Sequence, residues 1–367
     1  MKTTESILRK ESLSREDLIY ILQTQDEDER QLLFARARRV AAKYVGRQVS
    51  LRGLIELSNI CRKNCYYCGI RSGNNKSGRY LLNTREVLHA AEYAWKKGFG
   101  SVVIQSGERS DRTFTSSITE LLREIKSLSN HELGITLSCG EQSEDIYREW
   151  YEAGAHRYLL RIETSSRSLY GKLHPRDEFH SFDKRVEALR TLQRLGYQTG
   201  TGVMIGLPFQ HTGHLADDLI FMRDFNIDMV GMGPYIPHAD TPLARRCADI
   251  PSDEERIDLS LKMIALMRIM MKDINMAAST AMNTLDPAGR IKAIASGANI
   301  FMPNITPPAQ ACNYMLYEGK PIFTDMAEAS LAGLEENIAG MGMRVNYHLW
   351  GDSKHYHNRI ENTKPEQ

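Results

Sequence analysis

Eight short apolar stretches, separated by segments with helical periodicity, set the fold that this chain can adopt. The stretches begin at Leu51, Ser101, Gly134, Arg157, Thr199, Asp228, Asn275 and Asn299. Several of the intervening helical segments end in glycine, which is the preferred residue of a left-handed helix C-cap. Strands that alternate with helices are typical of parallel βα units, so eight units predict a complete (β/α)8 barrel of the TIM type.

The barrel accounts for most of the 367 residues, so we expect one domain with an extension at each end. Residues 1–48 form an N-terminal helical cap in this prediction, because the run from Asp26 to Tyr44 carries apolar residues at helical spacing. The barrel itself is expected at residues 49–345. Residues 346–367 are expected to be a C-terminal helical tail, whose last residues, from Ser353 on, are frayed or loosely docked.

The charge balance and the termini narrow the class of protein. The chain has 47 basic and 46 acidic residues, a balance that predicts binding neither to nucleic acid nor to an anionic membrane. The polar N-terminus lacks the apolar core of a signal peptide, and no segment reaches the ~18 apolar residues that span a bilayer. We therefore expect a cytoplasmic protein, and a monomer, since a complete barrel needs no partner to close.

Three of the six cysteines lie in the loop after the first expected strand, at Cys61, Cys65 and Cys68. Such βα loops carry the chemistry of barrel enzymes. Three thiolates on one loop can each take one iron of an iron–sulfur cube and leave the fourth iron open. A zinc site usually uses two Cys-x2-Cys pairs, and only one is present. Zinc with a distant fourth ligand, or three cysteines that only line a turn, remain the alternatives.

The Cys-x3-Cys-x2-Cys spacing, with Tyr67 just before the last cysteine, resembles the radical S-adenosylmethionine (SAM) superfamily. The resemblance implies one 4Fe–4S cluster on Cys61, Cys65 and Cys68, with SAM bound to the open iron through its methionine moiety. It also implies an enzyme that cleaves SAM reductively to a 5′-deoxyadenosyl radical, with Tyr67 near the adenine.

Residues at other strand ends match the SAM site of this superfamily. The turn at Ser106–Glu108 corresponds to one that contacts the methionine amino group. Glu163 can accept both ribose hydroxyls, and Arg185 can meet the SAM carboxylate with its planar fork. The glycines of residues 199–208 let a flat adenine approach the backbone. The implied cofactor-binding residues are Tyr67, Ser106, Gly107, Glu108, Ser138, Arg161, Glu163, Arg185, Met204 and Gly206.

Longer stretches, notably GMGPYIPHADTPLA and MPNITPP, resemble the HydE maturases of FeFe hydrogenase, which are related to biotin synthase and methylornithine synthase. For this branch the resemblance implies an anion-holding cavity and a small-molecule or small organometallic substrate. It also implies an external electron donor and other hydrogenase maturation proteins as partners. The implied substrate-binding residues are Arg52, Thr136, Ser279, Thr280, Met302, Tyr314 and Tyr317.

Some residues depart from the HydE pattern or have two interpretations. The stretch GKPIFTDMAEASLAG lacks the second cysteine group of some HydE proteins, so only one cluster is expected. Ile162 stands where a histidine is usual, which leaves the exact substrate open. For Cys139 we favour core packing over a place in the cavity. For His238 we favour loop hydrogen bonding over contact with substrate.

The leading hypothesis is therefore a HydE-type radical SAM maturase. A methylornithine-synthase-like mutase, or another small-molecule radical SAM enzyme, is the enzyme alternative, and a carboxylate-and-amine clamp in the cavity would favour the mutase. An iron–sulfur scaffold or carrier is the alternative from another class. Such a scaffold would hold its cluster without needing Glu108, Glu163 or Arg185.

Overall fold

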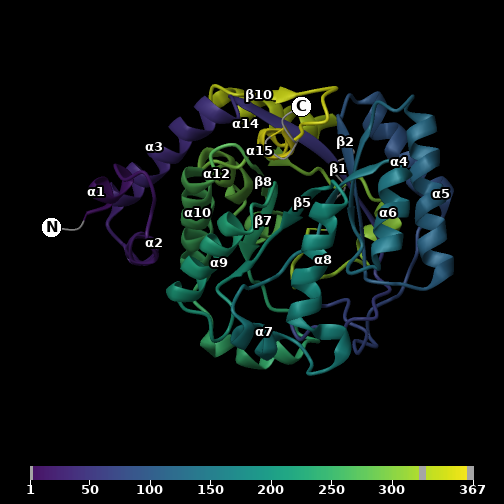
Figure 1. Ribbon diagram of the computed structural model, residues 1–367, viewed down its shortest axis with the longest axis horizontal. Helices are drawn as coiled ribbons and strands as arrows, with labels where there is room; N and C mark the ends of the chain where they lie inside the picture. The colour runs from purple at the N-terminus through teal and green to yellow at the C-terminus, as the bar shows by residue number, and fades with distance from the viewer. Residues whose placement is uncertain (1–2, 322–327, 362–367) are drawn as a thin grey trace.

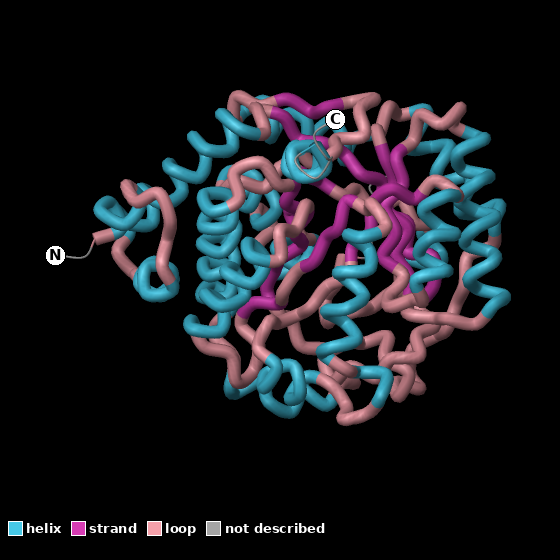
Figure 2. The backbone as a smooth tube through the Cα atoms, viewed as in Figure 1, coloured by secondary structure: helices cyan, strands magenta, loops and turns pink. Residues whose placement is uncertain are grey.

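Eight parallel strands close into a barrel in the computed structural model, which describes residues 3–321 and 328–361. Each strand pairs with the next along the chain, and β9 pairs back with β1 through Ser50 and Ile300. The strands lie at the centre and the helices surround them (Figure 2). The predicted barrel is confirmed. Its strands are β1 Gln48–Ser58, β2 Ser101–Ser106, β3 Gly134–Ser138, β4 Ala155–Leu159, β5 Gln198–Thr201, β7 Met229–Pro234, β8 Asn275–Ala278 and β9 Ile300–Phe301.

Two further strands extend this sheet. β6 (Met204–Ile205) follows β5 after a short break and pairs with the end of β7. β10 (Arg344–Asn346) pairs with the start of β1, at the N-terminal end of the barrel. The fifth predicted stretch is therefore split in two, and the chain returns to the barrel floor after its last unit.

The helices begin where the sequence offers a side chain that caps them. Asn83, Asp111 and Ser143 each accept a hydrogen bond from a backbone N–H of the first turn, at the start of α4, α5 and α6. The helices after β1 are α4 Thr84–Lys96, α5 Arg112–Leu128, α6 Glu144–Glu152, α7 Arg167–Leu173, α8 Phe182–Arg194, α9 Thr212–Asp224, α10 Asp253–Met270, α11 Thr280–Leu285, α12 Gly289–Ala295, α13 Pro308–Ala311, α14 Glu328–Gly340 and α15 Lys354–Glu361, with 3-10 turns at Glu178–His180 and Pro242–Asp249.

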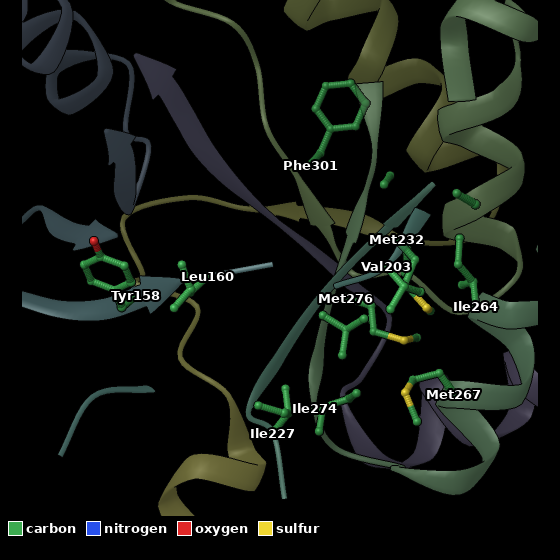
Figure 3. Close-up of a cluster of buried hydrophobic side chains, with 14 of the residues drawn as sticks. Tyr158, Leu160, Val203, Ile227, Met232, Ile264, Met267, Ile274, Met276 and Phe301 are labelled. Carbon is green, nitrogen blue, oxygen red and sulfur yellow. The ribbon is translucent and has the colours of Figure 1, made fainter. Parts of the chain in front are cut away.

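The main core lies between the outer faces of the strands and the helices. Figure 3 shows Ile264 and Met267 of α10 beside Met232 and Met276 of the neighbouring strands, and all four are buried. The methionines Met263 and Met267 of α10 therefore pack in the core.

The N-terminal helices lie against one flank of the barrel. They are α1 Thr4–Leu8, α2 Arg15–Gln23 and α3 Glu27–Tyr44. Arg15 pairs with Asp217 of α9 at 2.6 Å, and the buried Lys262 of α10 donates to the carbonyl of Thr24 at 2.5 Å. The residue boundaries of the cap, barrel and tail stay a prediction.

The C-terminal segment is not loosely docked as far as Glu361, contrary to the expectation for the residues from Ser353 on. Ser353 is fully buried, and Arg359 of α15 pairs with the buried Asp228 at 2.7 Å. β10 and α15 lie at one end of the molecule and α7 at the other (Figure 1). The segment therefore closes the N-terminal end of the barrel. None of the helices in the described ranges is long and apolar enough to cross a membrane.

Candidate active site

A cavity of about 350 Å³ runs inside the barrel toward the C-terminal ends of the strands. This size suits a small-molecule site, and the position is that of barrel active sites. All but one of the site residues expected from the sequence line it. They are Arg52, Cys61, Cys65, Tyr67, Cys68, Ser106, Gly107, Glu108, Thr136, Ser138, Arg161, Glu163, Arg185, Met204, Ser279, Thr280, Met302, Tyr314 and Tyr317.

The exception is Gly206, which is not among the residues that line the cavity in the described part of the chain. Its φ of +81° lies in the left-handed region, and a Cβ there would meet the side chain of Arg256. The turn and the approach of Arg256 account for this glycine. A role near the adenine stays a prediction without support from the cavity.

The three cysteines of the first loop face the cavity together. Burial and, to a smaller extent, the nearby Cys61 raise the pKa of the Cys65 thiol to about 12. Thiols crowded in this way become thiolates when a metal group takes up their charge. Soft thiolates are the usual ligands of iron–sulfur clusters. In the described residues, no group of three or more His, Cys, Asp or Glu side chains is arranged closely enough to hold a single metal ion.

The turn after β2 packs directly on the cysteine loop. The backbone N–H of Glu108 donates to Cys61 Sγ at 3.3 Å. A Cβ on Gly107 would lie 2.5 Å from the carbonyl oxygen of Ile60, so only glycine allows this approach. The cysteine loop and the Ser106–Glu108 turn thus form one wall of the cavity. Their close packing supports a cluster and cofactor bound at this wall.

A network of buried charges surrounds this wall. Glu108 accepts from Arg62 Nε at 2.9 Å and from the backbone N–H of Glu141 at 2.9 Å. Lys63 Nζ lies 3.4 Å from Glu108 and 3.2 Å from Glu141. Arg185 donates through Nε to Glu141. Burial alone would raise the pKa of Glu141, but Arg185 and Lys63 hold that pKa below its usual value.

Sequence reasoning missed Lys63 and Glu141, although both are central to the network. Lys63 stands between two of the cysteines, where charge on a nearly buried side chain has to be paired. Glu141 follows β3 by a few residues, in the same kind of loop as Glu108. Position in a βα loop could have indicated both residues. Their pairing could not be predicted, because Lys63 and Glu141 are 78 residues apart in the chain.

Arg161 and Glu163 form an ion pair on the next part of the wall. Arg161 Nε lies 3.1 Å from each carboxylate oxygen of Glu163. Both residues lie beyond β4, which ends at Leu159, rather than inside the strand as expected. Glu163 has a φ of +66° and bridges to Val203, a conformation that ends regular pairing. Ile162 points the other way and is fully buried in the outer core, so this substitution does not alter the cavity wall.

Tyr67 is fixed by a buried histidine that the sequence did not suggest. The Tyr67 hydroxyl lies 3.3 Å from His174 Nε2, and His174 Nδ1 lies 2.9 Å from the carbonyl oxygen of Tyr170. Burial lowers the pKa of His174 to about 3, so the ring is neutral. A neutral ring in this setting donates from Nδ1 to the carbonyl and accepts the Tyr67 proton at Nε2.

Two buried arginines lie at the floor of the cavity, where Arg52 lines the cavity and Arg157 lies behind Thr136. Arg157 donates to Thr136 Oγ1 at 3.0 Å and to Asp352 at 2.7 Å. Arg52 donates to the carbonyl oxygen of Gly351 at 3.0 Å and has no carboxylate partner in the described residues. Burial and the charge of Arg157 lower the pKa of Arg52. The floor therefore carries two cations against one carboxylate, which favours an anionic ligand above it.

The part of the wall formed by β1 contains a second ion pair, Glu56–Lys320, with 2.8 Å between Nζ and Oε1. Glu56 shares the inward face of β1 with Arg52 by strand periodicity, so the alternation could have indicated it. Thr280 begins α11 instead of ending a strand. Neither Cys139 nor His238 lines the cavity among the described residues. Cys139 is buried in the core, and His238 Nδ1 accepts from the backbone N–H of Asp240 at 3.1 Å.

The fold and the site define the class of this protein, a (β/α)8 barrel enzyme with a thiol-lined cavity at its mouth. A model of the Radical SAM superfamily matches residues 55–222. The [FeFe] hydrogenase maturase subunit HydE of Thermotoga maritima is 40% identical over 95% of this chain and 96% of its own length. The chain therefore belongs to the radical SAM superfamily, in its HydE-like branch. Enzymes of this superfamily use a 4Fe–4S cluster and SAM.

More distant relatives share the same fold. 3-Methylornithine synthase of Methanosarcina acetivorans is 28% identical over 81% of both chains. A crystal structure of methylornithine synthase superposes with a TM-score of 0.78 at 25% identity, covering 94% of this chain and 97% of the other. The structure of HydG, a maturase of the [FeFe]-hydrogenase, gives the same TM-score at 19% identity, over 98% of this chain and 79% of the other, which supports the fold alone.

Proposed function

We propose that this chain is a HydE-type maturase, which cleaves SAM reductively inside its barrel during assembly of the di-iron site of FeFe hydrogenase. The observation that carries the proposal is one cavity with three cysteines at its mouth and, at its floor, Arg52 with Arg157 behind it. The 40% identity to HydE over nearly the whole chain supports the particular role. A cytoplasmic location and a monomeric state stay predictions from the sequence.

The residues of the cavity mouth would hold the cofactors. In the proposal Cys61, Cys65 and Cys68 bind a single 4Fe–4S cluster, which together with SAM supplies one-electron reductive chemistry. Glu108 accepts the methionine ammonium group. Arg185 binds the methionine carboxylate, because its guanidinium is already held at the wall by Glu141.

Residues further along the wall would orient the rest of SAM. Glu163 accepts the ribose hydroxyls while Arg161 keeps its carboxylate ionised and in place. Tyr67 and Met204 flank the adenine, and His174 fixes the Tyr67 ring. Ser106, Gly107 and Ser138 complete the pocket and exclude water from it.

The floor would bind the substrate. Arg52 supplies the free cation, and Thr136 keeps Arg157 aligned. The remaining wall is formed by Ser279, Thr280, Met302, Tyr314 and Tyr317. An anionic small molecule or organometallic complex fits this charge arrangement. Other hydrogenase maturation proteins are the partners that this role requires.

A maturation assay tests the proposal. Cells that produce an FeFe hydrogenase and its other maturation proteins, but no HydE, are supplied with this chain. Hydrogenase activity should appear with the natural sequence and be absent with Cys65→Ala. No activity from a chain that cleaves SAM in vitro would show that the enzyme serves another substrate.

A methylornithine-synthase-like mutase is the second candidate, because Glu56 and Lys320 place a carboxylate and an amine in the cavity. These two groups neutralise each other at 2.8 Å, whereas Arg52 has no carboxylate partner in the described ranges. The maturase is therefore favoured. Conversion of lysine to methylornithine by the reconstituted protein would reverse that preference.

A further inference from the structure

Asp218 of α9 is a buried carboxylate outside the site described above. Its side chain is fully buried, and in the described part of the chain no Lys, Arg or His forms an ion pair with it. Burial raises the pKa of this carboxyl to about 7, although hydrogen bonds from Ser165 and Thr164 lower it. A buried carboxylate without a cation is unfavourable unless hydrogen-bond donors surround it. The donors that Asp218 meets therefore indicate its role.

All of these donors belong to the turn that follows Glu163. Asp218 Oδ1 accepts from the backbone N–H of Ser165 at 2.5 Å and from the Ser165 hydroxyl at 2.6 Å. The Thr164 hydroxyl lies 3.4 Å from the same oxygen. Asp218 Oδ2 has no hydrogen-bond partner among the described residues, so Oδ1 alone makes the contact with the turn. One atom of α9 thus holds the two residues that come directly after Glu163.

Glu163 needs such support because its backbone conformation is unfavourable by itself. Its φ of +66° lies in the left-handed region, which a residue with a side chain seldom occupies. The Glu163 N–H donates to the carbonyl oxygen of Gly202 at 3.0 Å, and the Glu163 carbonyl oxygen accepts from the N–H of Met204 at 3.1 Å. These bonds attach Glu163 to the neighbouring part of the barrel wall, and Asp218 attaches the chain that follows. The two attachments together aim the Glu163 side chain into the cavity.

We propose that Asp218 is a positioning residue of the SAM site, which holds residues 164–166 so that the Glu163 carboxylate faces the ribose. The inference rests on the proposed function, in which Glu163 accepts the ribose hydroxyls. Asp218 is not among the described residues that line the cavity, so it acts through Glu163 and not by contact with SAM. The far end of the turn is anchored as well, because Ser166 caps α7 by accepting from the backbone N–H of Leu169 at 3.3 Å.

Removal of the acceptor oxygen tests the proposal. Asp218→Leu keeps the approximate shape of the side chain but has no acceptor, whereas Asp218→Asn keeps one. Affinity for SAM is measured by calorimetry on reconstituted protein of known cluster content. Asp218→Leu should bind SAM roughly tenfold or more weakly than the natural protein, and Asp218→Asn should bind within about threefold of it. The matched control is Asp217→Leu in the same helix, which breaks a surface ion pair with Arg15 and should bind SAM normally.

A double-mutant cycle separates positioning from a general loss of structure. Glu163→Ala alone should weaken SAM binding. In that background Asp218→Leu should cost little further affinity, because the carboxylate that it positions is already absent. A purely structural effect would instead add to the effect of Glu163→Ala. Ser165→Ala, at a half-buried site, removes one donor to Asp218 and gives a second variant in case Asp218→Leu does not fold; it should weaken SAM binding by roughly threefold.

Three results would overturn the inference alone, provided that Glu163→Ala binds SAM weakly. They are natural SAM affinity in both Asp218→Leu and Ser165→Ala, equal weakening by Asp218→Leu and Asp218→Asn, and additive losses in the double variant. Natural SAM affinity in Glu163→Ala would instead refute the ribose role that the proposed function gives to Glu163, and the inference with it.

Discussion

Arg185 is the residue of the cavity wall that is best oriented to bind a carboxylate. Its Nε donates to Glu141 and its Nη1 donates to the carbonyl oxygen of Arg161 at 2.9 Å. These two bonds fix the plane of the guanidinium. A lysine at this position would keep the charge but lose the fork.

We therefore predict that Arg185→Lys weakens SAM binding while the protein keeps its cluster. Loss of one or two hydrogen bonds to a charged group costs about 1.5–3 kcal/mol, which is roughly a ten- to hundredfold fall in affinity. Calorimetry with reconstituted protein measures the SAM affinity, and iron analysis measures the cluster. Arg190→Lys, at an exposed site on the same helix, is the control and should bind SAM normally. Unchanged affinity in Arg185→Lys would contradict the assigned role.

His174 makes stability depend on pH. Its pKa is about 3 in the folded protein, against an ordinary value of about 6.5. Between these values the unfolded chain binds a proton that the folded protein does not. The free energy of unfolding therefore falls as the pH is lowered through this range.

We predict that His174→Gln loses less stability than the natural protein between pH 7 and pH 5, by about 2 kcal/mol. Urea unfolding at the two pH values measures the difference. Buried groups elsewhere contribute equally to both proteins and cancel. The exposed His89→Gln serves as the control and should keep the natural pH dependence. An identical pH dependence in His174→Gln would show that this ring is not held neutral by the fold.

Among the elements, the segment after β10 is packed against the barrel floor and is not a separate tail. The carbonyl of Trp350 and the carboxylate of Asp352 both accept from Arg157, and the carbonyl of Gly351 accepts from Arg52. The segment thus closes the barrel floor and partly neutralises its charge. Burial alone would raise the pKa of Asp352, but the hydrogen bond with His156 and the charge of Arg157 hold that pKa well below its usual value.

We predict that Asp352→Asn lowers the free energy of unfolding by about 3 kcal/mol, because it leaves Arg157 buried without a carboxylate partner. Urea unfolding at pH 7 measures this. Asp224→Asn breaks a surface ion pair with Arg223 and should change stability by less than about 1 kcal/mol. Similar effects of the two substitutions would mean that the floor does not depend on Asp352.

The elements also show how far the sequence could be interpreted. Strand periodicity and helix patterning predicted all eight barrel strands, because parallel βα units leave a strong local signal. The end of β4 was misplaced, since the left-handed conformation of Glu163 has no such signal. The docking of the C-terminal segment was missed, because Asp352 and Arg157 are 195 residues apart in the chain. In the site, the cysteine loop was predictable from spacing alone, whereas Glu141 and His174 act only through contacts formed on folding.

For the whole molecule, the barrel encloses a cavity that is basic at the floor and bears cysteines at the mouth. β9 pairs with β1 and closes the barrel wall, and the segment after β10 closes the N-terminal end. Ligands therefore enter the cavity from the C-terminal face of the barrel. A closed site of this kind excludes water and side reactions from radical chemistry.

Formation of 5′-deoxyadenosine is the measurement that tests this account most directly. The protein is reconstituted anaerobically with iron and sulfide and then given dithionite and SAM. We predict that the natural protein and Cys139→Ala, which alters a core cysteine, both form 5′-deoxyadenosine, and that Cys65→Ala forms none. A natural protein that carries a full cluster but leaves SAM intact would contradict the account and favour an iron–sulfur scaffold.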